Sequence, residues 1–321
     1  MSEPGGNLIS GVTGFIGQRL WQTLQNTGKP SIALVRRPLQ QGCFVVADLC
    51  DNVALENACS EVSAVFHCAG YAHAFSSLAN SDAEKHWRIN FEGTRNLVEA
   101  AGRAGVKRFV FLSSVKAMAE PGESCADEDF PGEPETAYGQ SKRAAERAVI
   151  EAGTRYGMHV VNLRLAMVYG AGGHGNLERM GRLVRKGIFP PLPETGNRRS
   201  LVHVDDVVAA ILAVEADTRT AGKTYIICGP EAPSGRQLFT GMCEAVGVKH
   251  YAWSFPASFF RQLGEVGECF GKLLGRRLPI NKEIVQRLLD SACYDGSRIQ
   301  ADIGWRPVVH LKDGLQEMLR R

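Results

Sequence analysis

Short apolar runs alternate with amphipathic segments through the first half of the chain. Apolar runs rich in β-branched and aromatic residues predict strands at residues 7–10, 31–35, 43–46, 64–67, 108–112 and 160–163. Between them, apolar residues recur at helical spacing over residues 15–25, 53–59, 83–104 and 138–156. Strands and helices that alternate in this way predict an α/β fold, a doubly wound parallel sheet with helices on both faces.

The pattern changes after Gly170, where Gly-rich and Pro-rich connections appear at residues 170–175 and 189–193. Residues 207–216 then predict a helix and residues 224–228 a strand, so we expect the chain to return to the main sheet before leaving it again. This pattern predicts two parts: a dinucleotide-binding domain from residues 1–169 plus 201–228, and a smaller, largely C-terminal substrate-binding region from residues 170–200 plus 229–321.

Composition excludes several classes of function. Charged residues make up 22% of the chain, the net charge is +3 and basic residues are scattered, so a nucleic-acid partner is not expected. The nine cysteines form no CxxC pair and no zinc-type Cys/His spacing, which predicts no metal site and favours reduced thiols. No signal peptide opens the sequence, and the longest apolar run, residues 207–214, is too short for a bilayer. We expect a soluble cytoplasmic protein with no membrane partner.

A glycine-rich turn follows the first predicted strand. Gly11, Gly14 and Gly17 are spaced GxxGxxG, and Phe15 and Ile16 open the next helix. Glycines allow a tight turn and let a pyrophosphate approach the backbone closely, and the N-terminus of the following helix attracts its negative charge. This context therefore predicts a Rossmann-type dinucleotide site. The spacing differs from GxGxxG, and a plain strand-to-helix turn is the alternative.

The end of the second strand predicts the cofactor. An acidic residue there would bind the ribose of NAD, but this strand ends in Arg36 and Arg37, and Arg36 could pair with a 2′-phosphate. NADP(H) is therefore favoured, with NAD(H) possible; both arginines could also be solvated surface charges. Asp48 and Leu49 follow the third strand and could meet the adenine, although Asp48 also suits a turn.

Tyr138 and Lys142 start a predicted helix, with the four-residue spacing that puts both side chains on one face. A phenol titrates near ~10, and an adjacent ammonium would lower that value toward the range of a general acid or base. Ser113 and Ser114 end the preceding strand, at the sheet edge where such folds bind ligands. A serine pair at a strand end is also ordinary turn chemistry.

Taken in order, these motifs resemble the extended short-chain dehydrogenases/reductases of the NAD-dependent epimerase/dehydratase family. The similarity runs through most of the chain and includes residues 11–17 (GVTGFIG), 65–69 (VFHCA), 90–97 (NFEGTRNL), 109–114 (FVFLSS), 138–142 (YGQSK), 164–170 (RLAMVYG) and 201–206 (LVHVDD).

The resemblance implies a role for each matched residue. Tyr138 would exchange a proton with the substrate oxygen, Lys142 would lower the pKa of Tyr138 and hold the nicotinamide ribose, and Ser114 rather than Ser113 would bind the substrate oxygen. The remaining implied residues support the cofactor site: Ala69 and Gly70 pass under the cofactor, and Asn90 supports the site from its helix.

Within the family, residues 175–187 and 196–203 look most like the branch that acts on nucleotide sugars in polysaccharide assembly. That resemblance makes Asn176, Arg198 and Arg199 candidates for substrate binding, the arginines near the diphosphate; a charged surface loop is the alternative. Two departures, Leu165 after Arg164 and Met118-Ala119 in place of a Tyr-Gly pair, weaken any transfer of substrate details. His67 and His203 are interpreted as packed strand residues.

The leading hypothesis is a reductase of a 4-keto nucleotide sugar, with Tyr138 supplying the proton. Three alternatives remain: a nucleotide-sugar 4-epimerase, a reductase of a steroid-like or phenolic ketone, and a non-catalytic NADP-binding sensor. The resemblance also implies a homodimer formed through the helices at residues 83–104 and 138–156.

Overall fold

The computed structural model describes residues 5–71, 81–173, 175–249, 252–273 and 281–320. Its centre is a parallel sheet of seven strands in the order β10-β7-β5-β4-β1-β2-β3. The strands are β1 (Gly6–Ser10), β2 (Ser31–Val35), β3 (Phe44–Val46), β4 (Val62–His67), β5 (Arg108–Ser114), β7 (His159–Leu165) and β10 (Lys223–Ile227). In this order β2 and β3 lie on one side of β1, and the later strands lie on the other side. This arrangement confirms the predicted Rossmann-type sheet.

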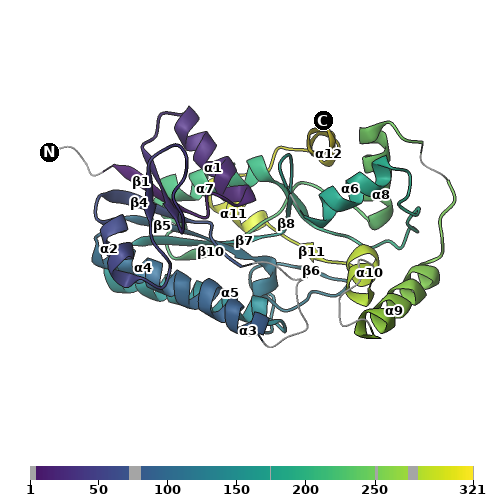
Figure 1. Cartoon of the computed structure of the whole chain (residues 1–321), viewed down its shortest axis with the longest axis horizontal. Coiled ribbons are helices and arrows are strands. Elements are labelled where there is room, and N and C mark those ends of the chain that lie inside the picture. Colours follow the sequence, from purple (N-terminus) through teal and green to yellow (C-terminus); the bar gives the residue numbers. More distant parts are fainter. Residues whose placement is uncertain (1–4, 72–80, 174, 250–251, 274–280, 321) are drawn as a thin grey trace.

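Helices cover both faces of the sheet (Figure 1). One face carries α1 (Phe15–Asn26), α7 (Val204–Ala216) and α11 (Ser297–Ile303), whose apolar side chains, among them Leu20, Ile211 and Ile299, share one core with the sheet. The other face carries α2 (Asn52–Cys59), α4 (Gly93–Arg103) and α5 (Ala137–Tyr156), with a second core that contains Leu55, Leu97 and Val149. The predicted helix at residues 83–104 is three segments, α3 (Ser81–His86), the π-helix η1 (Trp87–Glu92) and α4.

A third core lies beside the sheet and joins α6 (Asn176–Arg185), α8 (Gly235–Val246), α9 (Ala257–Leu273), α10 (Lys282–Leu289) and α12 (Leu311–Leu319). In Figure 1 these helices gather at the end of the molecule opposite the N-terminus. Short strands pair separately, β6 (Cys125–Ala126) with β11 (Cys293–Tyr294) and β8 (Met167–Tyr169) with β9 (Leu201–His203). Two single-turn helices are η2 (Val115–Ala117) and η3 (Thr218–Thr220). Within the described ranges, no helix has the length and apolar composition needed to cross a bilayer.

A disulfide joins Cys125 of β6 to Cys293 of β11, which corrects the expectation that the thiols are all reduced. The two residues are 168 positions apart and become neighbours only because β6 and β11 pair in parallel. Sequence spacing therefore carries no sign of this pairing. The remaining seven cysteines are free.

The disulfide predicts a thiol count. Alkylation of the unfolded protein without reductant should modify seven cysteines, and alkylation after reduction should modify nine, as counted by intact mass. Nine modified cysteines in protein that has never met a reductant would contradict the Cys125–Cys293 bond.

Candidate active site

The glycine-rich turn connects β1 to α1 and has no room for side chains. Gly11 has φ of 78°, and a Cβ there would lie 2.6 Å from the Ala69 nitrogen. A Cβ on Gly17 would collide with the Gly11 carbonyl, which already accepts the Gly14 amide at 2.9 Å. Gly14 caps α1 without a side-chain hydrogen bond, so the first-turn amides of Phe15 and its neighbours suit an anionic ligand. The cradle fits a dinucleotide pyrophosphate.

The segment after β4 lies between this turn and the lysine of α5. The Ala69 amide donates to the Ser10 hydroxyl at 3.3 Å. A Cβ on Gly70 would come within 3.3 Å of the Lys142 Nζ and 3.4 Å of the Asn90 Oδ1, so the backbone passes close to both groups. Asn90, fully buried in η1, holds the segment by accepting the Tyr71 amide at 2.7 Å and donating to the Tyr71 carbonyl at 3.0 Å. The supporting position predicted for Asn90 therefore has a clear structural basis.

The residues expected near the adenosine half lie at the carboxyl ends of β2 and β3. Arg36 follows β2 directly and is exposed. Asp48 is exposed and accepts the Cys50 amide at 2.9 Å, the turn interaction that was the alternative interpretation. Leu49 is half-buried, and its carbonyl accepts the Asn96 side chain at 2.9 Å.

Tyr138 and Lys142 project from the first turns of α5 toward the end of β5. Thr136 caps the helix by accepting the Gly139 amide at 3.1 Å. The Tyr138 phenol lies close enough to the Ser114 hydroxyl for Ser114 to lower the pKa of Tyr138. The Lys142 ammonium donates to the Leu112 carbonyl at 2.9 Å and lies 4.6 Å from the centre of the Phe111 ring. The structure thus brings together the three residues predicted to be catalytic.

Burial controls the charge of both groups. Desolvation raises the pKa of Tyr138 above its ordinary value, and the nearby Ser114 hydroxyl lowers it only in part. Desolvation also lowers the pKa of Lys142 to about 8, against the raising effect of Glu146 and Cys68. The predicted lowering of the Tyr138 pKa by Lys142 is therefore not found, because Lys142 is held by Leu112 and Phe111. A protonated phenol suits a proton donor.

Ser113 has a different environment from Ser114. It is buried and donates to the Glu146 carboxylate at 2.6 Å, in the packing between α5 and the sheet. This geometry agrees with the expectation that Ser114 is the serine of the site. Its catalytic role stays a prediction.

The predicted substrate arginines follow the 189–193 segment. Arg198 is exposed and donates to the Glu123 carbonyl at 3.4 Å, whereas Arg199 is half-buried and donates to the Asp290 carbonyl at 2.9 Å. Burial, then repulsion from Arg287, acts to lower the pKa of Arg199, while Tyr294 opposes this. Asn176 is exposed at the first position of α6.

Arg287 on α10 is a candidate that sequence reasoning missed, since it lies in a stretch without a motif. Arg287 acts to lower the pKa of Arg199 and so lies near it, although Tyr294, Glu120 and Asp290 act in the opposite direction. The only possible signal in the sequence was its charge.

His67 and His203 are packed side chains, as expected. His67 is fully buried between the Ser10 hydroxyl at 2.6 Å and the Thr94 hydroxyl at 2.9 Å, and burial lowers its pKa to about 3. His203 lies near Asp205 and Glu317, a group whose spacing could suit a metal ion. Arg19 forms ion pairs with both carboxylates, at 2.5 Å and 3.2 Å, so their charge is already compensated.

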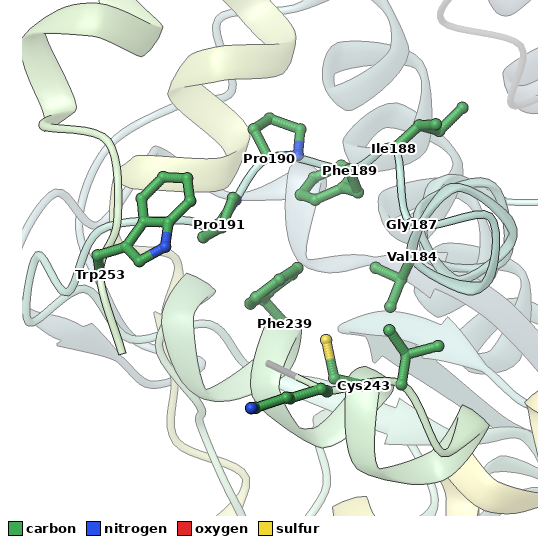
Figure 2. Close-up of a pocket in the computed structure, with 11 residues that line it drawn as sticks. Val184, Gly187, Ile188, Phe189, Pro190, Pro191, Phe239, Cys243 and Trp253 are labelled. Carbon is green, nitrogen blue, oxygen red and sulfur yellow. The ribbon is translucent and has the colours of Figure 1, made fainter. Parts of the chain in front are cut away.

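A cavity of about 210 Å³ lies apart from these residues, between α6 and α8 (Figure 2). Its walls are mainly apolar: Val184, Gly187, Ile188, Phe189, Pro190, Pro191, Phe239, Cys243, Val248, Lys249 and Trp253. None of the predicted catalytic residues lines it.

Comparison with known proteins identifies the family of the chain. The model of the "NAD dependent epimerase/dehydratase family" matches residues 7–228. A UDP-glucose 4-epimerase of Vibrio cholerae is 29% identical over 320 residues, 97% of this chain and 93% of that protein. A 2-alkyl-3-oxoalkanoate reductase of Stenotrophomonas maltophilia is 27% identical over 329 residues, 97% of each. The solved structure "MoeE5 in complex with UDP-glucose and NAD" aligns with a TM-score of 0.76 at 25% identity, over 98% of this chain and 97% of that one.

These similar proteins are enzymes, and the present chain keeps the glycine cradle, the serine at the end of β5 and the Tyr138/Lys142 pair. The sensor alternative accordingly falls away. The chain belongs to the NAD-dependent epimerase/dehydratase family and is an enzyme of the extended short-chain dehydrogenase/reductase type.

Proposed function

We propose that the enzyme reduces a 4-keto nucleotide sugar. The observation that carries this proposal is the grouping of Tyr138 and Lys142 on α5 beside the end of β5 that carries Ser114, where a buried, protonated phenol can give its proton to a developing alkoxide. A nicotinamide cofactor, when bound, supplies the hydride. The residues of the chain supply the proton, the orientation and the electrostatic stabilisation.

Each site residue has a defined part in this reaction. Ser114 lies near Tyr138 and would hold the substrate oxygen beside the phenol. Lys142 is positioned by the Leu112 carbonyl and carries the positive charge next to the Gly70 backbone, where we place the nicotinamide ribose. Gly11, Gly14 and Gly17 would hold the pyrophosphate.

We infer an anionic substrate from Arg198 and Arg199, the arginines that the family resemblance places near the diphosphate. Arg199 is half-buried and burial acts to lower its pKa, so a bound diphosphate would favour its charged form. Arg198 and Asn176, which are both exposed, would contact the same molecule. The similar structure in complex with UDP-glucose supports a nucleotide sugar.

A nucleotide-sugar 4-epimerase is the second candidate, favoured by the similarity to the Vibrio cholerae 4-epimerase over nearly the whole chain. An epimerase takes up and returns the hydride, so it converts a UDP-sugar into its C4 epimer without net consumption of cofactor. A steroid-like or phenolic ketone is the remaining alternative substrate.

One panel separates these functions. Purified enzyme should be incubated with UDP- and dTDP-linked 4-keto sugars, with UDP-hexoses and with apolar ketones, while reduced nicotinamide is followed by absorbance. We expect consumption of the cofactor with 4-keto nucleotide sugars. Epimerisation of UDP-hexoses without net cofactor change would replace the reductase by the epimerase, and turnover of apolar ketones alone would refute both.

We further propose a preference for NADPH over NADH, because Arg36 occupies the strand end where a ribose-binding carboxylate would lie. Arg36→Asp should reverse the preference, since it removes the partner of the 2′-phosphate and adds one for the ribose. The matched control is Arg37→Asp, which changes the next exposed position. If the wild type binds NADH about tenfold more tightly than NADPH in a fluorescence titration, the proposed role of Arg36 is wrong.

The predicted assembly is a homodimer formed through residues 83–104 and 138–156, in a cytoplasmic protein. Exposed Trp87 in η1 lies against Phe91, with ring centres 4.6 Å apart, and marks apolar surface on these helices. Light scattering at micromolar concentration should give twice the chain mass of 34.9 kDa. A monomer under these conditions would refute the dimer.

A further inference from the structure

A buried carboxylate, Glu146, lies one helical turn beyond Lys142 on α5. Tyr138, Lys142 and Glu146 follow one another at intervals of four residues, so they share one face of the helix. All three face the carboxyl end of β5: Lys142 donates to the Leu112 carbonyl, Glu146 accepts from the Ser113 hydroxyl, and Tyr138 lies near the Ser114 hydroxyl. Glu146 is therefore the third member of a continuous row of polar contacts between α5 and β5.

Two strands and the helix itself hold the Glu146 carboxylate in place. Ser113 of β5 donates to Oε1 at 2.6 Å, and Arg164 of β7 donates to Oε1 at 3.0 Å and to Oε2 at 2.8 Å. Arg143, on the same helix, approaches Oε2 at 3.7 Å. The side chains of Glu146 and Arg164 are each only 5% exposed. The carboxylate consequently has one orientation.

A buried ion pair of this kind is weak evidence for stability, because desolvation offsets most of the attraction between the charges. An apolar pair would pack the same interface at no electrostatic cost. Arg164 also donates to the Glu128 carbonyl at 3.2 Å, and the Glu128 carboxylate forms an ion pair with Arg298 at 3.3 Å. The charge of Glu146 thus needs a reason beyond packing, and Lys142 is the functional group next to it.

The groups around Lys142 differ in charge. Burial disfavours the ammonium, while Glu146 and Cys68 raise the pKa of Lys142. From β4, His67 is neutral because burial lowers its pKa to about 3, and the Cys68 thiol stays protonated because burial raises its pKa to about 12. Tyr138 is a protonated phenol. Of the groups named here, Glu146 is the one that provides a negative charge near neutral pH.

We propose that Glu146 is a positioning residue for the reaction: its carboxylate, fixed by Ser113 and Arg164, places a negative charge one helical turn from the Lys142 ammonium and so holds that ammonium for cofactor binding. Glu146 acts through Lys142 and does not touch the substrate. The inference rests on the cofactor-binding role proposed for Lys142, but not on the identity of the substrate, and cofactor binding is therefore the measurement of choice.

The test is the affinity for NADPH as a function of pH, measured by fluorescence on the full chain. Affinity should fall as pH rises and Lys142 loses its proton. In Glu146→Gln the midpoint of this fall should move to lower pH by about one unit or more, because the neighbouring negative charge is gone. In Arg164→Gln it should move to higher pH, because Glu146 then acts on Lys142 without its counter-charge.

Controls separate this effect from structural damage. Glu146→Asp keeps the charge and should stay near the wild-type midpoint, as should Glu151→Gln, an exposed change on the same helix. The two opposite shifts are independent, so either variant decides the question if the other does not fold. Unchanged midpoints with a lowered melting temperature would show a purely structural role and overturn the proposal. A substrate other than a nucleotide sugar would leave these shifts as predicted.

Discussion

Replacement of Tyr138 by phenylalanine should lower turnover by roughly 10² or more, the range expected when a general acid is removed. The variant keeps the ring that packs beside His86, with ring centres 5.5 Å apart, and loses only the hydroxyl that lies near Ser114. Affinity for the cofactor should barely change, because the glycine cradle and Lys142 are intact. Steady-state kinetics and a fluorescence titration measure the two quantities separately.

The matched control is Tyr156→Phe at the far end of the same helix, where the hydroxyl donates to Glu99 at 2.8 Å. That variant should keep wild-type turnover. Ser114→Ala should also lower turnover more than Ser113→Ala, since the Ser113 hydroxyl is committed to Glu146. Near-normal turnover in Tyr138→Phe on the true substrate would mean that the proton comes from another group.

Replacement of Lys142 by methionine should lower both turnover and cofactor affinity. The change deletes the ammonium that lies by the Gly70 backbone, where we place the nicotinamide ribose, and so removes a group that positions the cofactor for hydride transfer. The sign of the pH dependence follows from the pKa of Lys142, which burial lowers to about 8. In the wild type, activity should fall as pH rises through this value, because the ammonium is lost.

In Lys142→Met this alkaline fall should disappear, and the small remaining activity should extend to higher pH, limited by Tyr138 alone. Lys29→Met, at an exposed turn far along the chain from the site, is the control and should keep the wild-type profile. A Lys142→Met enzyme with the wild-type pH profile would show that another group titrates.

The sheet and the glycine cradle could be predicted because their physical causes are local. Alternating apolar runs specify strands such as β4 and β5, and the turn at Gly11 requires a residue that tolerates positive φ. The position of Tyr138 and Lys142 on one face of α5 likewise follows from their four-residue spacing and the geometry of a helix. These features need no knowledge of distant contacts.

Other features depend on contacts that sequence spacing does not record. The Cys125–Cys293 bond and the contact of Arg199 with the Asp290 carbonyl both arise from packing between distant segments. The pKa of Tyr138 is a further example. The spacing of Tyr138 from Lys142 predicts a lowered pKa, yet burial raises the pKa of Tyr138, and the Lys142 ammonium donates to the Leu112 carbonyl instead. Desolvation is a property of the folded environment and outweighs the local pattern.

The proposed reduction of a nucleotide sugar at C4 is tested most directly by isotope transfer. Enzyme, a 4-keto nucleotide sugar and reduced cofactor carrying deuterium at the transferable position should be incubated together, and the product examined by mass spectrometry and NMR. If hydride passes from the cofactor to C4, we expect one deuterium at C4 of the sugar, with transfer slowed in Tyr138→Phe by roughly 10² or more. A reduced sugar without deuterium, or an unreduced sugar with the cofactor intact, would contradict it.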